Sequence, residues 1–285
     1  DRQRAWRTIR GARSATINLH KTRLMRCEND AEVYGRAMHH LDLSRVCNEH
    51  RGRPLTIRAV MNDTALKPTI KPIVVLVSGR GSNLQALLTT ATVERWDTAL
   101  GAKIAAVVSD RADAEALGVA RAHHVPVHIL GHGEFGSRAA FDEALARTLE
   151  RYAPELIVLA GFMRVLTPEF VRRYAGRLIN IHPSLLPSFP GLNTHQRALD
   201  AGVRVHGATV HFVSEEVDAG PIIAQAAVAV HADDDKVKLA ERVLQQEHRL
   251  LPQAVRHVLE GRVRYADRRV VLKDIGEGEL SLLAS

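Results

Sequence analysis

From residue 73 onward, short hydrophobic runs alternate with longer amphipathic segments. The first run, Ile73 to Val77, is continuous and rich in β-branched residues, which is typical of a strand covered on both faces. A helical pattern over 84–95 follows it. The same alternation then predicts strands at 104–108, 125–129, 156–160 and 178–181, and helices at 114–123, 138–152 and 168–174. This order predicts an α/β fold with a doubly wound, mostly parallel sheet.

The pattern changes after residue 200. Strands are expected at 209–213 and 222–230, on either side of the polar segment 214–221. A long helix over 235–260 follows, and the runs at 263–265 and 270–272 predict a closing hairpin. Because no internal repeat or composition break follows Met61, we expect a single domain from residue 68 to 285.

The start of the chain differs in charge from the rest. Residues 1–60 hold 13 Lys/Arg and 6 Asp/Glu, whereas residues 61–285 hold 26 of each. The two cysteines, Cys27 and Cys47, also lie in this first segment. We expect residues 1–67 to be a basic, weakly ordered extension without catalytic work, and one interpretation is that it includes sequence upstream of a start at Met61. An organelle-targeting segment and a nucleic-acid-binding arm are the alternatives.

The remaining composition is ordinary for a soluble globular protein. No apolar run reaches the length of a membrane span, so no membrane partner is expected. The body has no cysteine and needs no disulfide, which favours a cytoplasmic location. Nucleic acid is not an expected partner of the body, because its charge is balanced.

A glycine-rich segment, 78–83 (Ser-Gly-Arg-Gly-Ser-Asn), follows the first strand directly. Glycines let backbone N–H groups turn toward an anion, and the next helix presents its positive end. A dinucleotide motif would need a third glycine where Leu84 stands, and no Walker Gly-Lys-Ser/Thr follows. The segment therefore predicts a site for a phosphate monoester, with a tight turn that binds no ligand as the alternative.

Two polar residues end the strand at 178–181. Asn180 and His182 lie two apart and should point to the same side of the strand, and Pro183 then forces the chain to turn. A donor amide beside a titratable base suits acyl-group chemistry, although a lone histidine at a strand end is usually structural. We interpret Ser184 as a turn residue. The following segment, 185–194, is rich in proline and suggests a lid.

A third candidate segment, 214–221, is acidic and ends in Gly-Pro. Asp218 lies where this loop re-enters a strand, so it is either a site carboxylate or part of a solvated loop. His206 and His211 precede it and raise the alternative of a metal site. They are five residues apart and have no cysteine partner, so the spacing argues against metal.

Taken together and in this order, these segments closely resemble the folate-dependent phosphoribosylglycinamide formyltransferases of the formyltransferase family. The resemblance runs from about Ile73 to Tyr265 and rests on V-L-V-S-G-R-G-S-N-L-Q-A-L, L-A-G-F-M-R-V-L, N-I-H-P-S-L-L-P-S-F-P-G and V-D-A-G-P-I-I. It implies a Rossmann-like formyltransferase domain. Asn193 departs from the pattern, because relatives often carry histidine there.

The resemblance also implies roles for individual residues. The catalytic residues would be Asn180, His182 and Asp218. The substrate phosphate and its ribonucleotide would be held by Gly81, Ser82, Asn83 and Glu247. The folate would be bound by Arg138, Met163, Arg164, Val165, Leu166 and Asn180.

The implied reaction moves the formyl group of 10-formyltetrahydrofolate, as co-substrate, to the amine of glycinamide ribonucleotide in purine biosynthesis. Transfer would be direct, through a tetrahedral intermediate and without a metal. Asn180 and a protonated His182 would donate hydrogen bonds to the oxyanion, and Asp218 would pair with the histidine cation. The chain would act as a monomer or a homodimer.

Other functions remain as alternatives at this stage. A 10-formyltetrahydrofolate hydrolase would use a similar site with water as acceptor, but segment 78–83 would then have no purpose. Methionyl-tRNA formyltransferase would need an RNA-binding domain after the hairpin. A non-catalytic nucleotide- or RNA-binding protein would leave the combination of Asn180, His182 and Asp218 unexplained.

Overall fold

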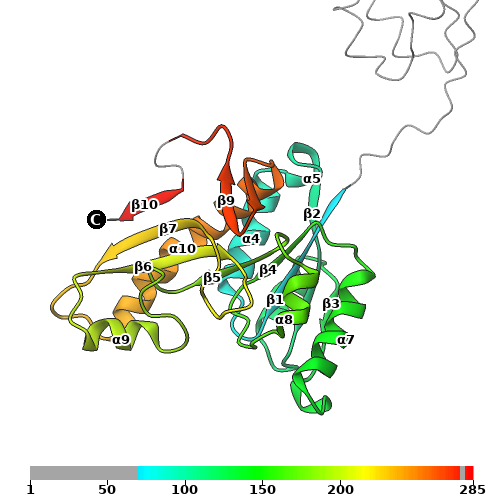
Figure 1. The fold of residues 1–285 in the computed structure, drawn as a ribbon, viewed down its shortest axis with the longest axis horizontal. Coiled ribbons are helices and arrows are strands. Elements are labelled where there is room, and N and C mark those ends of the chain that lie inside the picture. The colour runs from blue at the N-terminus through cyan, green and yellow to red at the C-terminus, as the bar shows by residue number, and fades with distance from the viewer. Residues whose placement is uncertain (1–69, 277–279, 285) are drawn as a thin grey trace, which may run out of the picture. The chain divides into compact units, whose positions relative to one another are not determined.

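The computed structural model describes residues 70–276 and 280–284 (Figure 1). The chain divides into two units, Asp1–Lys67 and Pro68–Ser285, and every described residue lies in the second. The expected weak order of the N-terminal extension therefore falls outside the described residues.

The described residues form an eight-stranded sheet with the strand order β10-β7-β6-β5-β4-β1-β2-β3. Its strands are β1 (Lys71–Val77), β2 (Ala102–Ser109), β3 (Val127–Ile129), β4 (Leu156–Leu159), β5 (Leu178–His182), β6 (Val205–Phe212), β7 (Ile222–Ala229) and β10 (Ser281–Ala284). Only β6 runs against its neighbours, β5 and β7, and all other pairs are parallel. The predicted mostly parallel sheet is confirmed.

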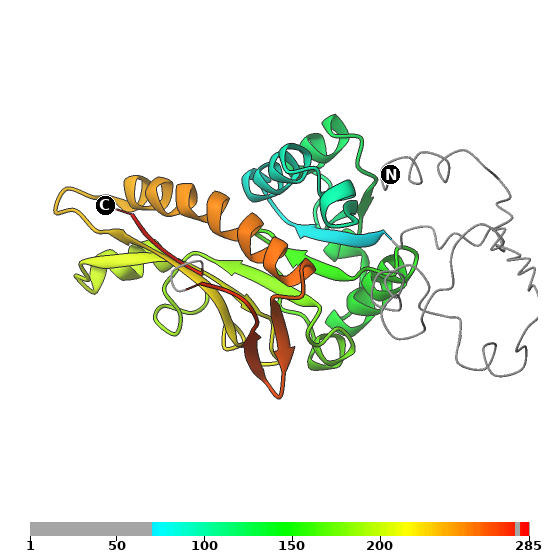
Figure 2. The same ribbon diagram turned by 90° about the horizontal axis from the view of Figure 1, so that it is seen from above.

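Helices cover both faces of this sheet (Figures 1 and 2). They are α4 (Ser82–Val93), α5 (Trp96–Ala99), α6 (Ala116–Ala122), α7 (Arg138–Glu150), α8 (Pro168–Arg173), α9 (Thr194–Asp200) and α10 (Lys236–Leu259), with a 3-10 turn, η2 (His132–Glu134). No helix in the described ranges is both long and apolar enough to cross a membrane.

The alternation of side chains along β1 explains the two layers of helices. Ile73, Val75 and Val77 belong to a core that includes α4 and α10, whereas Val74 and Leu76 belong to a second core with α7 and α8. All five are at most 1% exposed. A strand that is apolar at every position is therefore buried on both faces, as its sequence predicts.

Several boundaries differ from the prediction, and α5, η2, α9 and β10 were not predicted. The hairpin forms as β8 (Val263–Ala266) and β9 (Arg269–Leu272), a separate two-stranded sheet. Helix α9 was not predicted, and it begins after Asn193 without a side-chain cap. Strand β10 lies in the tail after residue 274, for which no element was predicted, and it pairs in parallel with β7.

The strand order also gathers the candidate segments. From β1 the chain proceeds to β2 and β3 on one side, while β4 and β5 lie on the other side, so the order reverses between β1 and β4. Ligands of doubly wound sheets bind at the carboxyl ends of the strands at such a switch point. Segments 78–83 and 161–167 follow β1 and β4, and His182 ends β5, so all three lie at this edge.

Candidate functional site

His182 and Asp218 lie side by side at the carboxyl end of β5. The Nδ1 atom of His182 is 3.3 Å from Oδ2 of Asp218, and both side chains are largely buried. The same carboxylate oxygen accepts a hydrogen bond from the backbone N–H of Gly191 at 2.8 Å. Asp218 therefore links the strand end to the loop that follows it.

The other ring nitrogen of His182 also faces an oxygen. Nε2 lies 3.0 Å from the carbonyl oxygen of Phe189, which can only accept a hydrogen bond. A neutral imidazole carries one N–H and can donate to only one of the two acceptors. Donation to both Asp218 and Phe189 requires the doubly protonated ring, and Asp218 is placed to pair with that form.

Asn180 is oriented by a histidine on the neighbouring strand. It lies opposite His211 in the β5–β6 register, and its Nδ2 is 3.2 Å from His211 Nε2. The Nδ1 of His211 lies 2.9 Å from the carbonyl of Phe212, so Nδ1 carries the proton and Nε2 accepts from the amide. Burial lowers the pKa of His211, which keeps the ring neutral and the acceptor available.

The loop that carries Asp218 is held close to β6. Asp218 adopts a left-handed backbone conformation, with φ of 54°. A Cβ added to Gly220 would lie 1.8 Å from the carbonyl oxygen of Phe212, so only glycine fits at this position. The close contact at Gly220 is therefore with the protein backbone itself.

The turn after His182 is fixed from two strands. The hydroxyl of Thr209 on β6 donates to the carbonyl of Ser184 at 2.7 Å and accepts from the N–H of Leu186 at 3.0 Å. Gln225 on β7 donates to the carbonyl of Leu186 at 2.9 Å. Ser184 is fully buried, and its hydroxyl donates to the carbonyl of Ser188 at 2.6 Å. Ser184 is therefore a turn residue, as interpreted from the sequence.

Segment 78–83 forms the start of α4 and contacts α6. Gly81 precedes the helix with φ of 83°, and a Cβ there would lie 2.6 Å from the Cα of Ala116. Both the left-handed conformation and this contact require glycine. The first turn of α4 contains no acidic residue. Its N–H groups and positive end are therefore open to an anion.

Asn83 and Glu247 join α4 to α10 beside this turn. Asn83 Nδ2 donates to Glu247 Oε2 at 2.6 Å, and both residues are buried. Burial raises the pKa of the Glu247 carboxyl, against the opposing effects of the Asn83 hydrogen bond and the positive charge of Arg80. Asn83 Oδ1 is buried and accepts no hydrogen bond from a described residue. The pair thus keeps one acceptor unused.

The segment after β4 lies against the same edge of the sheet. Its Met163 N–H donates to the hydroxyl of Ser78 at 2.9 Å, which ties it to the end of β1. Met163 and Val165 are 69% and 47% exposed, whereas Leu166 is 7% exposed. Two exposed apolar side chains beside a buried one form a surface that an apolar ring system could cover.

Arg164 and Arg138 are both associated with α7. The guanidinium of Arg164 lies over the ring of Phe141, 4.3 Å from its centroid. Arg138 is exposed at the first position of the same helix, one turn before Phe141. The resemblance implied that Arg138 contacts the folate. The structure places its helix next to segment 163–166 through Phe141.

A second group of histidines lies beneath the loop at 185–191. The ring of His206 packs edge-to-face against those of Phe189 and His195, with centroids 5.8 and 5.3 Å away. Burial lowers the pKa of His206 to about 4, so the ring is neutral at physiological pH. Across the described ranges, no group of three or more His, Cys, Asp or Glu residues could hold a metal ion.

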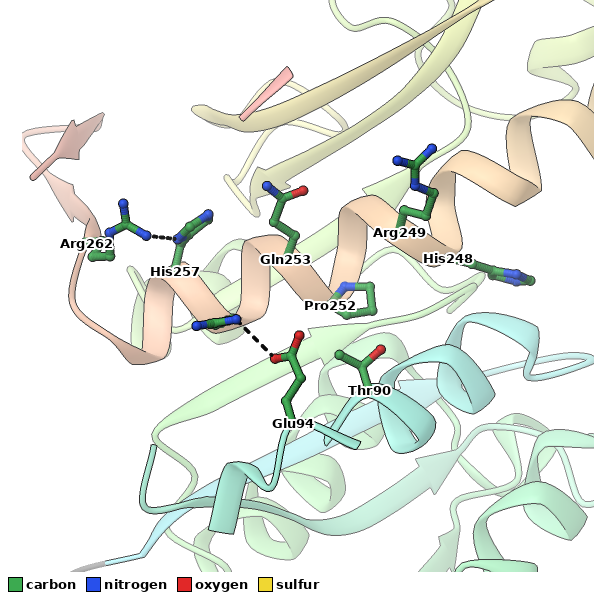
Figure 3. Close-up of a pocket in the computed structure, with 9 residues that line it drawn as sticks. Thr90, Glu94, His248, Arg249, Pro252, Gln253, His257 and Arg262 are labelled. Carbon is green, nitrogen blue, oxygen red and sulfur yellow. Dashed lines mark hydrogen bonds and ion pairs between the residues drawn. The ribbon is translucent and has the colours of Figure 1, made fainter. Parts of the chain in front are cut away.

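A separate cavity of about 460 Å³ lies between α4 and α10, away from His182 (Figure 3). Arginines line it, but most of their charge is already paired. Arg256 contacts Glu94 and Glu260, and Arg262 contacts the same Glu260 and the carbonyl of Asp274. Cations that are already neutralised leave little attraction for an anion, so we place no ligand here.

Comparison with known proteins identifies the family. The family described as formyl transferase matches residues 71–255. The phosphoribosylglycinamide formyltransferase of Escherichia coli (strain K12) is 46% identical over 192 residues, which cover 67% of this chain and 89% of that protein.

Two solved structures share this fold at different levels of sequence identity. Glycinamide ribonucleotide transformylase 1 from Symbiobacterium toebii is 45% identical with a TM-score of 0.68, covering 72% of this chain and 95% of that one. A formyltetrahydrofolate deformylase from Pseudomonas syringae pv. tomato is 31% identical with a TM-score of 0.65, covering 72% of this chain and 66% of that one. On the family match and the identity to full-length relatives, the chain belongs to the formyl transferase family.

Proposed function

We propose that this protein transfers the formyl group of 10-formyltetrahydrofolate to the amine of glycinamide ribonucleotide, a step of purine biosynthesis. One observation supports this best: His182, Asp218 and Asn180 lie at the same sheet edge as the phosphate-type turn at 78–83. The relatives named as phosphoribosylglycinamide formyltransferases support the choice of acceptor.

In this proposal the acceptor amine attacks the formyl carbon while the carbon–oxygen π pair moves to oxygen. Asn180 Nδ2 and the His182 Nε2–H donate to the resulting oxyanion. The formyl oxygen takes the place of the Phe189 carbonyl as the acceptor of Nε2–H. Collapse of the intermediate breaks the bond from carbon to the folate nitrogen.

A proton must move from the attacking amine to the departing folate nitrogen. His182 is the group best suited to exchange it, because imidazole titrates near neutral pH. Asp218 stabilises the cationic ring, and His211 holds the Asn180 amide in the donating orientation. None of these steps requires a metal ion or a covalent enzyme intermediate.

The two substrates would bind on either side of this centre. Gly81, Ser82 and Asn83 would hold the phosphate and ribose with Glu247. Met163 to Leu166, with Arg138 and Asn180, would hold the folate, whose flat ring suits the exposed apolar side chains there. The acceptor amine and the formyl donor would then meet beside His182.

We also propose that residues 68–285 form the catalytic domain and that the enzyme acts in the cytoplasm as a monomer or homodimer. The family match begins at residue 71 and supports this boundary. A chain that lacks residues 1–67 is expected to keep its turnover. Loss of turnover in that chain would assign the extension a role in catalysis.

The proposal is tested by an assay with and without the acceptor. Purified protein is mixed with 10-formyltetrahydrofolate, and release of tetrahydrofolate is followed with glycinamide ribonucleotide, without it, and with an acceptor that lacks the phosphate. We expect release only with the phosphorylated acceptor. Equal release without an acceptor would instead support the deformylase function.

A further inference from the structure

Arg80 is the one charged residue in segment 78–83, and the site described above does not use it. It lies between Gly79 and Gly81, immediately before α4, and its side chain is exposed. No described residue forms a salt bridge with it. Arg80 therefore presents a guanidinium at the entrance of the turn.

Without Arg80, the charges around this turn add little attraction for a phosphate beyond the N–H groups of α4. A phosphate monoester carries about −1.5 to −2 charges at neutral pH, and the start of a helix supplies only about +0.5. The ionised form of Glu247 adds one negative charge beside Asn83. With these two charges alone the turn would be slightly negative overall. The positive charge of Arg80 makes it slightly positive.

We propose that Arg80 binds the phosphate of the acceptor substrate and selects phosphorylated acceptors over unphosphorylated ones. The guanidinium can form two parallel hydrogen bonds to phosphate oxygens, while backbone N–H groups of the α4 start bind the remaining oxygen. This inference rests on the proposed function and extends the site beyond Gly81, Ser82, Asn83 and Glu247.

Arg80 also connects the phosphate to the buried carboxylate. Its positive charge acts on Glu247 and opposes the effect of burial on that group. Asn83 Oδ1, which accepts no hydrogen bond from a described residue, is available to a sugar hydroxyl next to the phosphate. The arrangement thus suits a ribose phosphate, with the anion at Arg80 and the sugar at Asn83 and Glu247.

The test measures binding of ribose 5-phosphate and of ribose by calorimetry, which does not depend on turnover. Arg80→Ala should weaken binding of ribose 5-phosphate by about tenfold or more, the scale of a lost hydrogen bond between charged groups. Arg80→Lys should restore part of this affinity. Ribose should bind equally to all three proteins.

Lys103→Ala is the matched control, because Lys103 is an exposed cation at the amino end of β2. This end of the parallel strands is opposite to the end that carries segment 78–83. It should leave the affinity for ribose 5-phosphate unchanged. Equal affinities of the wild type and Arg80→Ala would overturn the proposal, as would no detectable binding to the wild type.

Steady-state kinetics separate this inference from the proposed function. In Arg80→Ala, KM for glycinamide ribonucleotide should rise by a similar factor, while KM for 10-formyltetrahydrofolate stays the same. If the wild type transfers formyl groups but Arg80→Ala keeps its KM, only the role of Arg80 is wrong. If the wild type transfers none, the proposed function itself fails.

Discussion

The Asp218 carboxylate lies 3.3 Å from Nδ1 of His182 and accepts a hydrogen bond from Gly191 through the same oxygen. Because Nε2 of His182 faces the Phe189 carbonyl, the ring is held at both ends. A histidine fixed in this way loses little freedom when it acts on a substrate. The His182–Asp218 contact and the position of the loop therefore depend on each other.

Replacing either member of the pair should reduce turnover without unfolding the protein. His182→Ala removes the proton-transfer group, and Asp218→Asn removes the charge that stabilises its cation. We expect each to lower kcat by about 10²–10⁴, the usual contribution of general acid–base catalysis. Initial rates and thermal melting measure the two properties. Asp113→Asn, which changes an exposed carboxylate, should keep full turnover, and near-normal turnover of His182→Ala would show that its role is wrong.

His211 should affect catalysis through Asn180. Asn180→Ala should lower kcat by about 10²–10³, equivalent to about 2.7–4 kcal/mol for one oxyanion donor. His211→Phe leaves the amide in place but removes its acceptor, so a smaller loss of kcat with an unchanged KM is expected. If His211→Phe raised KM and left kcat intact, it would not be orienting an oxyanion donor.

Glu247→Gln should stabilise the fold above neutral pH. Burial raises the pKa of Glu247 in the folded protein, so ionisation costs stability as pH rises above the unfolded value of about 4.5 and through the folded pKa. Glutamine keeps an oxygen for the Asn83 amide but carries no charge. Melting curves should therefore show a higher Tm than wild type at pH 8 and no gain at pH 4. A lower Tm at pH 8 would contradict the cost of the buried charge.

His206 should contribute to loss of stability in acid. Its folded pKa is lowered by burial from 6.5 to about 4, so the unfolded state binds the proton first as pH falls through this window. The loss between pH 7 and pH 4 is about 3 kcal/mol, at 1.36 kcal/mol for each unit of the pKa shift of this buried ring. His206→Phe keeps a ring against Phe189 and removes the titrating group. Urea unfolding at pH 7 and pH 4 measures the free energy of unfolding of both proteins. An equal loss of stability between these pH values in the wild type and in His206→Phe would refute the prediction.

Much of the fold follows from local pattern, whereas its exceptions depend on tertiary contacts. The apolar run Ile73 to Val77 of β1 predicts burial on both faces, and each of these five residues belongs to one of the two cores. Helix α9 spans only seven residues, and Asn193 before it has a left-handed conformation and forms no side-chain cap. Strand β10 exists through pairing with β7, more than 50 residues away, which local sequence does not encode.

In the candidate site too, local sequence predicts some features and tertiary contacts determine the others. The spacing of Asn180 and His182 predicts a common direction, and both lie at the end of β5. The register of β5 with β6 brings His211 opposite Asn180, and that register cannot be read from either strand alone. Likewise, the role of Thr209 depends on a turn 25 residues away in sequence. A search for polar residues on β6 would have suggested both His211 and Thr209.

The most direct test of the account follows the formyl carbon itself. The protein is given 10-formyltetrahydrofolate labelled in the formyl group together with glycinamide ribonucleotide, and the products are separated. We predict that the label appears on the acceptor amine, that almost none appears as formate, and that His182→Ala forms neither product at a comparable rate. Label released as formate whether or not the acceptor is present would contradict the account.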